Sequence, residues 1–475
     1  MNLLLDLEIL GWLLVGLAVL MGVPVGVAWA YSEPLAPYLV ASLVAAGFGA
    51  PLVVSVRAPE RRLRTRDAFL VVTGGWLLAS IFGGLPYVLV GVLDPVGAFF
   101  EAASGFTTTG STVISDIEAL PHALHFWRSL TQWIGGMGII VFTIAILPLL
   151  GIGGMQLFKA EVPGPITDKL TPRVADTARR LWLVYVGFTA AAFLCLRAAG
   201  MGGFDAICHA FTTLATGGFS TRQASIGAFG PGVQWVVVFF MFCAGVNFVL
   251  HYQLVTGRVR VVMRDAELRF YVLALTLLTA AVGLDLLRAG AAAPLRDAAF
   301  QVTSLLTTTG FATTDYELWP ALAQLLIVPL LAMGGMAGST AGGFKSLRLL
   351  IGWRSVRVTL GRIVHPHAVR MVRFNDRPIA DSVVSGVGVF FVAYGLVTLA
   401  GALTVASAGY DVVTSFSAAL TAISNVGPGL GAVGPTDDFA HLPGYVKATL
   451  GVLMIAGRLE IFTLLVVFSP AFWRR

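Results

Sequence analysis

The sequence has few charged residues and few cysteines. Only 12% of its 475 residues are charged, against about a quarter in soluble globular chains. The three cysteines, Cys195, Cys208 and Cys243, have no CxxC spacing, so they indicate neither a disulfide framework nor a metal site. The seven histidines are scattered and no HExxH motif occurs, so no zinc hydrolase is indicated. These absences argue against a soluble domain and against a metalloenzyme.

Long apolar runs are what the chain has instead. It is 57% hydrophobic, and runs of the roughly 18 or more residues that a spanning helix needs recur along its length. The first run is preceded by Asp6 and Glu8 with no Lys or Arg, which is the wrong charge for a signal peptide. We therefore expect a retained helix there and a multi-pass protein in the lipid bilayer. The clear runs begin near Leu10, Ala36, Ala68, Leu181, Gln234, Phe270, Val383 and Val446.

The net charge of +6 is distributed in a way that indicates membrane topology. Basic residues gather in 57–66, 159–180, 257–269 and 345–377, whereas 94–121 and 409–443 carry carboxylates and no Lys or Arg. Basic loops remain in the cytoplasm, so we expect cytoplasmic N- and C-termini. The basic balance therefore gives no reason to expect nucleic-acid binding.

One pattern recurs four times between the basic segments. Two long spans flank a segment too short to cross the membrane, followed by a loop of small residues. The loop glycines, Gly110, Gly217, Gly310 and Gly427, are roughly a hundred residues apart, which indicates an internal repeat. The prediction is an all-α polytopic membrane protein with four parallel helix–pore loop–helix repeats around a central pore. An N-terminal transmembrane hairpin (1–57) precedes repeats 58–158, 159–257, 258–364 and 365–475, and the third repeat has a broken second helix.

The loops contain no titratable side chain, which argues against acid–base or nucleophilic catalysis and predicts that the chain is not an enzyme. Aligned on the glycine, they are TTGS (108–111), ATGG (215–218), TTGF (308–311) and NVGP (425–428). They offer main-chain carbonyls and Thr hydroxyls, the groups that replace the hydration shell in potassium-selective filters. In this alignment Ala215 has a methyl where the first and third loops have a hydroxyl. The alternative is that these small residues only pack helices closely.

Two features are predicted below the loops. Glycines with Ser-Thr between them interrupt the second helix of the third repeat, each costing about 1 kcal/mol relative to Ala in a helix. An unwound stretch at mid-membrane lines a cavity, although a kink or a packing face remains an alternative. Arg458 lies in the last apolar span, two residues before Glu460. It is either a pore cation barrier or the partner of a buried carboxylate.

Several phrases make the chain resemble the Trk/Ktr/HKT superfamily of potassium transporters, and most of all its bacterial TrkH type. They are SGFTTTGST (104–112), FWRSLTQWIGGMGIIV (126–141), TLATGGFS (213–220), TSLLTTTGF (303–311), GGMAGSTAGGFKSLR (334–348), AISNVGPGLG (422–431) and AGRLEIFTLL (456–465). The extra N-terminal hairpin favours the TrkH type over the Ktr type. The resemblance implies potassium uptake across the bacterial cytoplasmic membrane, with K+ as the transported ion and no cofactor bound by this chain.

The resemblance also implies particular site residues and partners. The expected partners are a second copy of the chain and a cytosolic nucleotide-binding regulatory ring on the basic face around 345–377. The expected gate consists of Arg458, Gly334, Gly335, Gly338, Gly342, Gly343 and Lys345. The expected potassium-binding filter consists of Thr108, Thr109, Gly110, Ala215, Thr216, Gly217, Thr308, Thr309, Gly310, Asn425, Val426 and Gly427.

Two other interpretations were weighed against a channel-like pore. An alternating-access secondary transporter, coupling K+ or another solute to Na+ or H+, also uses broken helices. Such proteins usually have inverted repeats and a charged midplane site, whereas these repeats are parallel and their loops neutral. The GxGxxG match at 429–434 has no strand–loop–helix context, so it does not indicate a dinucleotide site.

Overall fold

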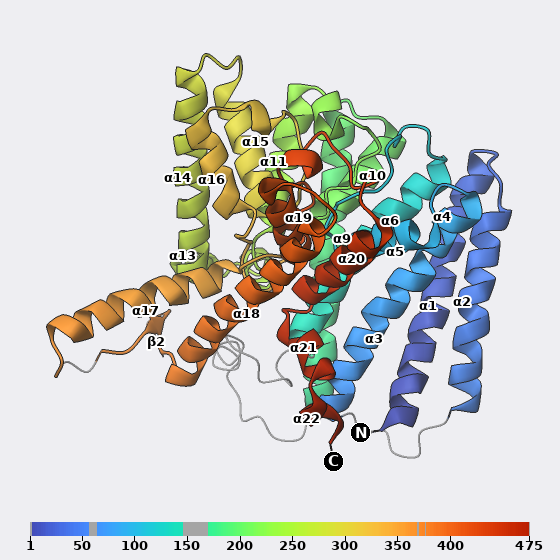
Figure 1. The fold of residues 1–475 in the computed structure, drawn as a ribbon, viewed down its shortest axis with the longest axis horizontal. Helices are drawn as coiled ribbons and strands as arrows, with labels where there is room; N and C mark the ends of the chain where they lie inside the picture. The colour runs from blue at the N-terminus through green and yellow to red at the C-terminus, as the bar shows by residue number, and fades with distance from the viewer. Residues whose placement is uncertain (1, 57–63, 146–169, 368–369, 376, 475) are drawn as a thin grey trace.

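The computed structural model describes residues 2–56, 64–145, 170–367, 370–375 and 377–474, and these residues are mainly helical (Figure 1). Within them, six helices are long and apolar enough to cross a membrane, or up to eight if each of two sharply bent helix pairs is one span. The prediction of an all-α polytopic membrane protein is confirmed. The expected boundaries at 57/58 and 158/159 lie outside the described residues.

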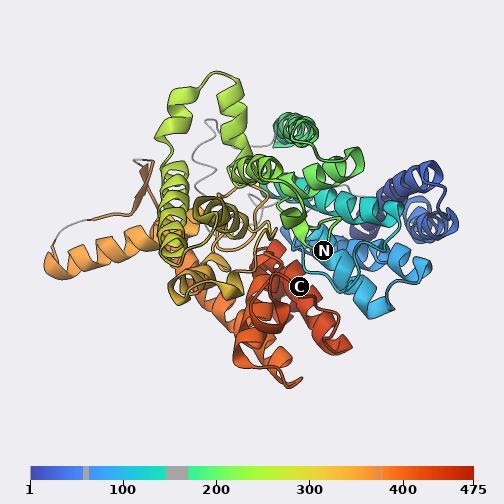
Figure 2. The same ribbon diagram turned by 90° about the horizontal axis from the view of Figure 1, so that it is seen from above.

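The N-terminal hairpin consists of α1 (Leu3–Ala30) and α2 (Ala36–Ser55), which pack along each other. They cross where Gly11 faces Gly49: a Cβ on Gly11 would lie 2.7 Å from the Leu52 Cβ. Small residues at such a crossing let two membrane helices approach closely. The hairpin lies at one edge of the molecule, beside the first repeat (Figure 2).

Each of the four repeats places a short helix between longer ones. The first contains α3 (Thr65–Gly83), α4 (Leu85–Val90), α5 (Pro95–Phe106) and α6 (His122–Ala145). The second contains α9 (Leu170–Ala198), α10 (Gly203–Leu214), η1 (Ser225–Ala228), α11 (Pro231–Ala244) and α12 (Phe248–Val255), and α13 (Val259–Arg264) follows it.

The third and fourth repeats follow the same order. The third contains α14 (Ala266–Arg288), α15 (Pro294–Leu306), η2 (Tyr316–Leu318), α16 (Ala321–Leu330) and α17 (Ser346–Val364). A ladder of β1 (Arg373–Phe374) and β2 (Arg377–Pro378) pairs antiparallel before the fourth repeat. The fourth contains α18 (Asp381–Ala406), α19 (Val412–Ser424), η3 (Gly431–Val433), α20 (Gly444–Arg458), α21 (Phe462–Phe468) and α22 (Pro470–Trp473).

The helices α5, α10, α15 and α19 are the short helices predicted from the sequence, and we call them the pore helices. They have 12 or 13 residues, too few to cross a bilayer, for which a helix needs about 20. Asp94 and Asp411 cap α5 and α19, and their carboxylates accept backbone N–H groups there. Seen from above, the repeats follow one another around the centre of the molecule (Figure 2).

The second helix is broken in three repeats, whereas the sequence predicted a break only in the third. In the third repeat, residues 331–345 separate α16 from α17. In the second, α11 and α12 meet at 99° around 245–247, where the Asn247 side chain caps α12. In the fourth, α20 and α21 meet at 116°, and Glu460 and Ile461 between them have positive φ. Three spans therefore contain non-helical main chain in the middle of the molecule.

The α17 helix projects sideways from the helix bundle (Figure 1). It lies towards the end of the molecule that holds both chain termini, which the charge pattern predicts to be cytoplasmic. The β1–β2 ladder lies beside it, and the Ile379 N–H donates to the Val372 carbonyl across the ladder. This end of the third repeat therefore carries a platform outside the helix bundle.

Candidate ion pathway

The four loops after the pore helices have one backbone conformation. Thr108, Thr216, Thr308 and Asn425 have φ of 55°, 54°, 55° and 55°, and the glycine two residues later also has positive φ. The residue between them donates its N–H to the carbonyl five positions earlier at 2.8–3.0 Å in all four loops. A left-handed conformation in a Thr costs free energy and persists only where the surrounding structure imposes it. Because it recurs in three threonines and one asparagine, the four loops share one local structure.

This conformation corrects the sequence alignment of the second loop. The glycines at the equivalent position are Gly110, Gly218, Gly310 and Gly427, with φ of 88°, 77°, 79° and 103°. Gly217 instead matches Thr109, Thr309 and Val426. Its N–H donates to the Thr212 carbonyl, and the N–H groups of the other three likewise donate to the carbonyl five residues earlier in the chain. Ala215 matches Thr107 and not Thr108, so the expectation that it replaces a loop hydroxyl at the Thr108 position is wrong. Thr216 holds that position.

The loops contact one another in a closed ring. A Cβ on Gly110 would lie closer than 3.0 Å to the Gly217 carbonyl oxygen, which no real Cβ contact allows. In the same way Gly218 abuts the Thr309 carbonyl, Gly310 the Val426 carbonyl and Gly427 the Thr109 carbonyl. Each glycine thus faces a carbonyl in the next repeat, and that carbonyl belongs to the residue just before the equivalent glycine there. The fourth repeat contacts the first in the same way, which closes the ring. Eleven of the twelve predicted filter residues therefore lie in the four loops of this ring, joined by Gly218, whereas Ala215 precedes the second loop at the position equivalent to Thr107.

Side chains around the ring hold its main chain. The buried Gln132 of α6 donates to the Gly217 carbonyl (2.6 Å) and accepts from the Phe219 N–H (3.1 Å). Ser111 donates to the Gly427 carbonyl (3.0 Å), and Asn425 Nδ2 donates to the Thr109 hydroxyl (3.0 Å). The sequence analysis did not single out Gln132, although its amide interrupts an apolar helix.

A buried ion pair lies behind the first loop. Glu101 of α5 and Arg128 of α6 are 2.9 Å apart, with side chains 0% and 1% exposed. Glu101 also accepts from the Val113 N–H (2.9 Å), and Arg128 donates to the Ser220 carbonyl (3.2 Å) of the second loop. The pair therefore ties two neighbouring loops to each other. Sequence reasoning missed it, although a charged residue inside an apolar segment signals a functional or paired group.

Carboxylates lie on the side of the ring away from the chain termini. Glu317 of η2 accepts from the Gly431 N–H (2.6 Å), which fixes the chain that follows the fourth loop. Burial raises the pKa of Glu317 above its ordinary value, and the nearby Asp315 and Asp437 add to this effect. Negative charge at such a position raises the local concentration of cations.

Residues 334–343, which we call the gate segment, lie directly against the other side of the ring. The Gly342 N–H donates to the Thr308 hydroxyl at 2.6 Å, and both groups are buried. The Thr340 hydroxyl donates to the Leu214 and Ala244 carbonyls at 3.1 and 3.2 Å. The segment is therefore packed beneath the ends of pore helices from different repeats, next to the ring of loops.

The break in the second repeat accommodates this segment. The Met336 N–H donates to the Gly245 carbonyl (2.8 Å), and the Phe248 N–H donates to the Gly338 carbonyl (3.1 Å). A Cβ on Gly335 would lie 2.7 Å from the Gly245 carbonyl oxygen. Two stretches of non-helical main chain thus satisfy each other's polar groups within the protein, as chain at membrane depth must.

Arg458, the last residue of α20, holds the gate segment from the fourth repeat. Its side chain is buried and donates to the Thr340 carbonyl at 2.7 Å and to the Gly135 carbonyl at 3.3 Å. Within the part of the chain that the structure describes, Arg458 forms no ion pair with a carboxylate, and Glu460 is paired with Arg348. Lys345 donates to the Ala341 carbonyl, inside the gate segment. The predicted gate residues thus gather below the ring.

Comparisons with known proteins agree with this geometry. Residues 39–475 match the TrkH family, described as cation transport protein. The chain is 42% identical over 440 residues to the Trk system potassium uptake protein TrkH of Salmonella typhimurium, covering 91% of each, and 38% identical over 486 residues to that of Halomonas elongata, covering 100% of each. The crystal structure of the potassium transporter TrkH from Vibrio parahaemolyticus superposes with a TM-score of 0.92 at 37% identity, covering 100% of both chains. The chain belongs to the TrkH family of cation transport proteins.

Proposed function

We propose that this protein takes up potassium through a channel-like pore in the bacterial cytoplasmic membrane, with the ring of four loops as its selectivity filter. The observation that carries the proposal is the closed ring, in which four loops of one conformation meet main chain to main chain. Carbonyls arranged around one axis replace the hydration shell of a cation. The identity of the ion as potassium is proposed from the relatives that are named as potassium uptake proteins.

The chemistry of the ring suits a monovalent cation. The loops offer neutral oxygens, and the Thr108 hydroxyl is buried with no hydrogen-bond partner in the part of the chain that the structure describes. The pore helices end at the ring, so the partial negative ends of their dipoles favour positive charge there. In this proposal the filter comprises the residues expected from the sequence other than Ala215, together with Gly218.

The gate segment and Arg458 close this pathway. A cation leaving the ring meets the gate segment, whose Gly342 contacts Thr308, and then the Arg458 guanidinium. The segment is held by several hydrogen bonds to the second repeat and by others to Thr308, Glu267 and Arg458. Opening then requires that the hydrogen bonds of Thr340, including the one from Arg458, be broken.

The proposal extends to two partners. The α17 helix has large apolar side chains on its exposed surface: Trp353, Leu360 and Ile363 are 59%, 58% and 70% exposed. An apolar face of this kind on a projecting helix suits a second copy of the chain. The basic residues of the same platform suit a soluble nucleotide-binding regulatory subunit, which the family resemblance implies. Cross-linking through a cysteine at Trp353 in membranes tests the first partner, and co-purification tests the second.

Uptake of radioactive rubidium into proteoliposomes tests the function. We expect uptake that follows the potassium gradient, is competed by K+ more than by Na+, and persists without a proton or sodium gradient. Uptake that requires an imposed H+ or Na+ gradient would instead support the alternating-access transporter. Protein-free vesicles and a pore variant such as Gly310→Ser serve as controls.

A further inference from the structure

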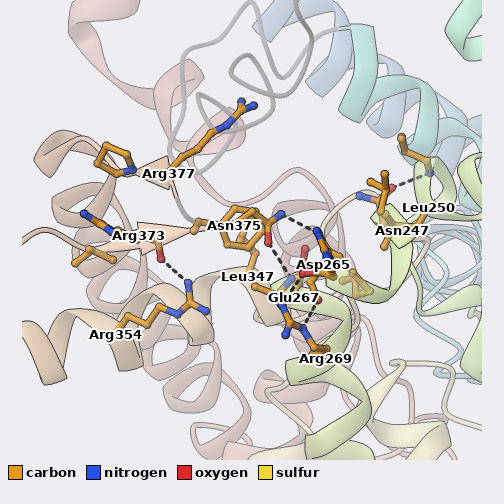
Figure 3. A pocket seen from close by; sticks show the side chains of 18 of the residues that line it. Asn247, Leu250, Asp265, Glu267, Arg269, Leu347, Arg354, Arg373, Asn375 and Arg377 are labelled. Carbon is orange, nitrogen blue, oxygen red and sulfur yellow. Dashed lines mark hydrogen bonds between the residues drawn. The ribbon is translucent and has the colours of Figure 1, made fainter. Parts of the chain in front are cut away.

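A large cavity lies at the start of the third repeat, at the end predicted to be cytoplasmic, and reaches the gate segment at Met336 (Figure 3). Its volume is about 980 Å³, at the upper end of the roughly 300–1,000 Å³ typical of ligand sites. The walls come from α12 and its N-cap, from α13, the start of α14, α17 and the β1–β2 ladder. The cavity is therefore bounded by the platform outside the helix bundle.

The cavity has a strong excess of positive charge. Among the residues that the structure describes, its lining includes two carboxylates, those of Asp265 and Glu267, and six arginines: Arg264, Arg269, Arg354, Arg357, Arg373 and Arg377. Figure 3 shows arginines on both sides, with Arg354 and Arg373 on the platform and Arg269 on α14. So many guanidinium groups around one hollow raise the local concentration of anions.

Both carboxylates are already engaged in holding the fold. Asp265 accepts from the Leu268 N–H (2.8 Å) and from the Asn375 amide (3.0 Å), which joins the start of α14 to the ladder. Glu267 is 4% exposed and accepts from the Ala337 N–H (2.7 Å). Their carboxylate oxygens thus accept hydrogen bonds from neighbouring amides.

The mixed lining indicates what kind of anion fits. Guanidinium forks bind phosphate oxygens in a bidentate manner, and apolar side chains such as Leu250, Val358 and Phe374 form the rest of the wall. A bare phosphate would fill only a small part of the volume. The chemistry is that of a phosphate group attached to a larger body, which either an anionic phospholipid or a soluble phosphorylated compound supplies.

The floor of this cavity is the beginning of the gate segment. Met336 lines the cavity, and its N–H bonds to the Gly245 carbonyl at the break of the second repeat. Glu267 also lines the cavity and holds the next residue, Ala337. A ligand in the cavity therefore lies against the part of the chain that leads to Thr340 and Arg458.

We propose that this cavity binds a phosphate-bearing anion and that the bound anion holds the gate segment in its place beneath the ring. A ligand stabilises the conformation that it binds better, and the arrangement in this structure has the cavity formed and the gate segment against Thr308. Binding therefore lowers potassium flux. This regulatory half depends on the proposed function, whereas the binding half does not.

The binding experiment uses the purified full chain with matched double variants. R264Q/R357Q removes two cavity arginines, and R258Q/R260Q removes two arginines beside the cavity that do not line it. In nanodiscs of uncharged phosphatidylcholine, calorimetry with inorganic pyrophosphate tests the soluble source. Native mass spectrometry with added dioleoylphosphatidylglycerol tests the lipid source.

We expect R264Q/R357Q to bind at least one of the two probes at least tenfold more weakly than wild type, and R258Q/R260Q to bind it within about twofold of wild type. The probe that binds identifies the source of the phosphate. Equal weakening in both variants, or no specific binding of either probe to wild type, overturns the site.

The flux experiment tests regulation separately. Rubidium uptake by wild type should fall at least threefold when the binding probe is present, and uptake by R264Q/R357Q should not change. If wild type binds the probe but its uptake stays constant, the regulatory half is overturned. If no variant transports rubidium at all, the proposed function fails, and the binding data still decide whether the site exists.

Discussion

Replacing Arg458 by alanine is the sharpest test of the proposed gate. The buried guanidinium donates to the Thr340 carbonyl at 2.7 Å and to the Gly135 carbonyl at 3.3 Å. Arg458→Ala removes a positive charge from the pathway and releases one attachment of the gate segment. Because Glu460 pairs with Arg348, the change leaves the Glu460 carboxylate with its partner. Both consequences predict a higher basal potassium flux.

The size of the effect follows from simple electrostatics. A potassium ion about 6 Å from the guanidinium, at an effective dielectric constant near 20, is repelled by about 3 kcal/mol. At about 1.4 kcal/mol per tenfold change in rate, removal of this barrier accelerates passage by up to roughly a hundredfold. Each charged hydrogen bond to the gate segment is worth about 1.5–3 kcal/mol, so loss of the attachment acts in the same direction.

Arg458→Lys separates the two contributions. Lysine keeps the charge but lacks the planar fork that reaches two carbonyls. We expect rubidium uptake into proteoliposomes, per folded protein, to rise by roughly ten- to a hundredfold in Arg458→Ala and by less than about tenfold in Arg458→Lys. Uptake that falls in Arg458→Ala in proportion to lost folded protein would refute the gate and assign Arg458 a structural role only.

Three further changes test the surroundings of the pathway. Glu101→Gln leaves the buried Arg128 charge without its partner, which lowers the free energy of unfolding by about 3–5 kcal/mol. The thermal unfolding midpoint should therefore fall clearly, and an unchanged midpoint contradicts a stabilising role of the pair. Thr340→Val loses the hydroxyl contacts of the gate segment and should raise rubidium uptake, with a less than additive effect in combination with Arg458→Ala; full additivity would mean that the two residues act on different barriers. Glu317 has a raised pKa in the folded protein, so its contribution to stability is present below its ordinary pKa of 4.5 and is lost as the pH rises through the folded value. Glu317→Gln should therefore lose less stability than wild type as the pH rises above 4.5, and parallel curves of unfolding midpoint against pH would exclude this linkage.

The sequence predicts the architecture well because its signals are local and repeated. Runs long enough to span, short segments between them and a glycine-containing loop after each follow from the bilayer thickness and from backbone geometry. The break in the third repeat was also predictable, since residues 334–343 are dense in glycine. These features need no knowledge of which segments meet in space.

What the sequence leaves undetermined depends on contacts between distant segments. The second loop offers two adjacent glycines, and the choice of Gly218 follows only from where α10 ends and from its contact with Thr309. The bend after Ala244 arises because the Gly245 carbonyl accepts from Met336, ninety-one positions away along the chain. In the same way, Glu101 and Arg128 were visible as charges in apolar segments, but their pairing was not.

The most direct test of the filter ring is the ion selectivity of Gly218→Ala compared with Gly217→Ala. Gly218 has φ of 77° and faces the Thr309 carbonyl, so a side chain there strains the main chain by about 1–2 kcal/mol and also pushes on the neighbouring loop. At Gly217 the added Cβ would lie closer than 3.0 Å to the Gln132 side chain and not against main chain, so the side chain that bonds this loop has to shift while the backbone stays unstrained. The measurement is the inhibition of rubidium uptake by Na+ and by K+ in proteoliposomes. The account predicts that Gly218→Ala loses its preference for K+ over Na+ by roughly tenfold or more, equivalent to about 1.4 kcal/mol, and that Gly217→Ala keeps more of that preference. Unchanged discrimination in Gly218→Ala together with its loss in Gly217→Ala would contradict the ring.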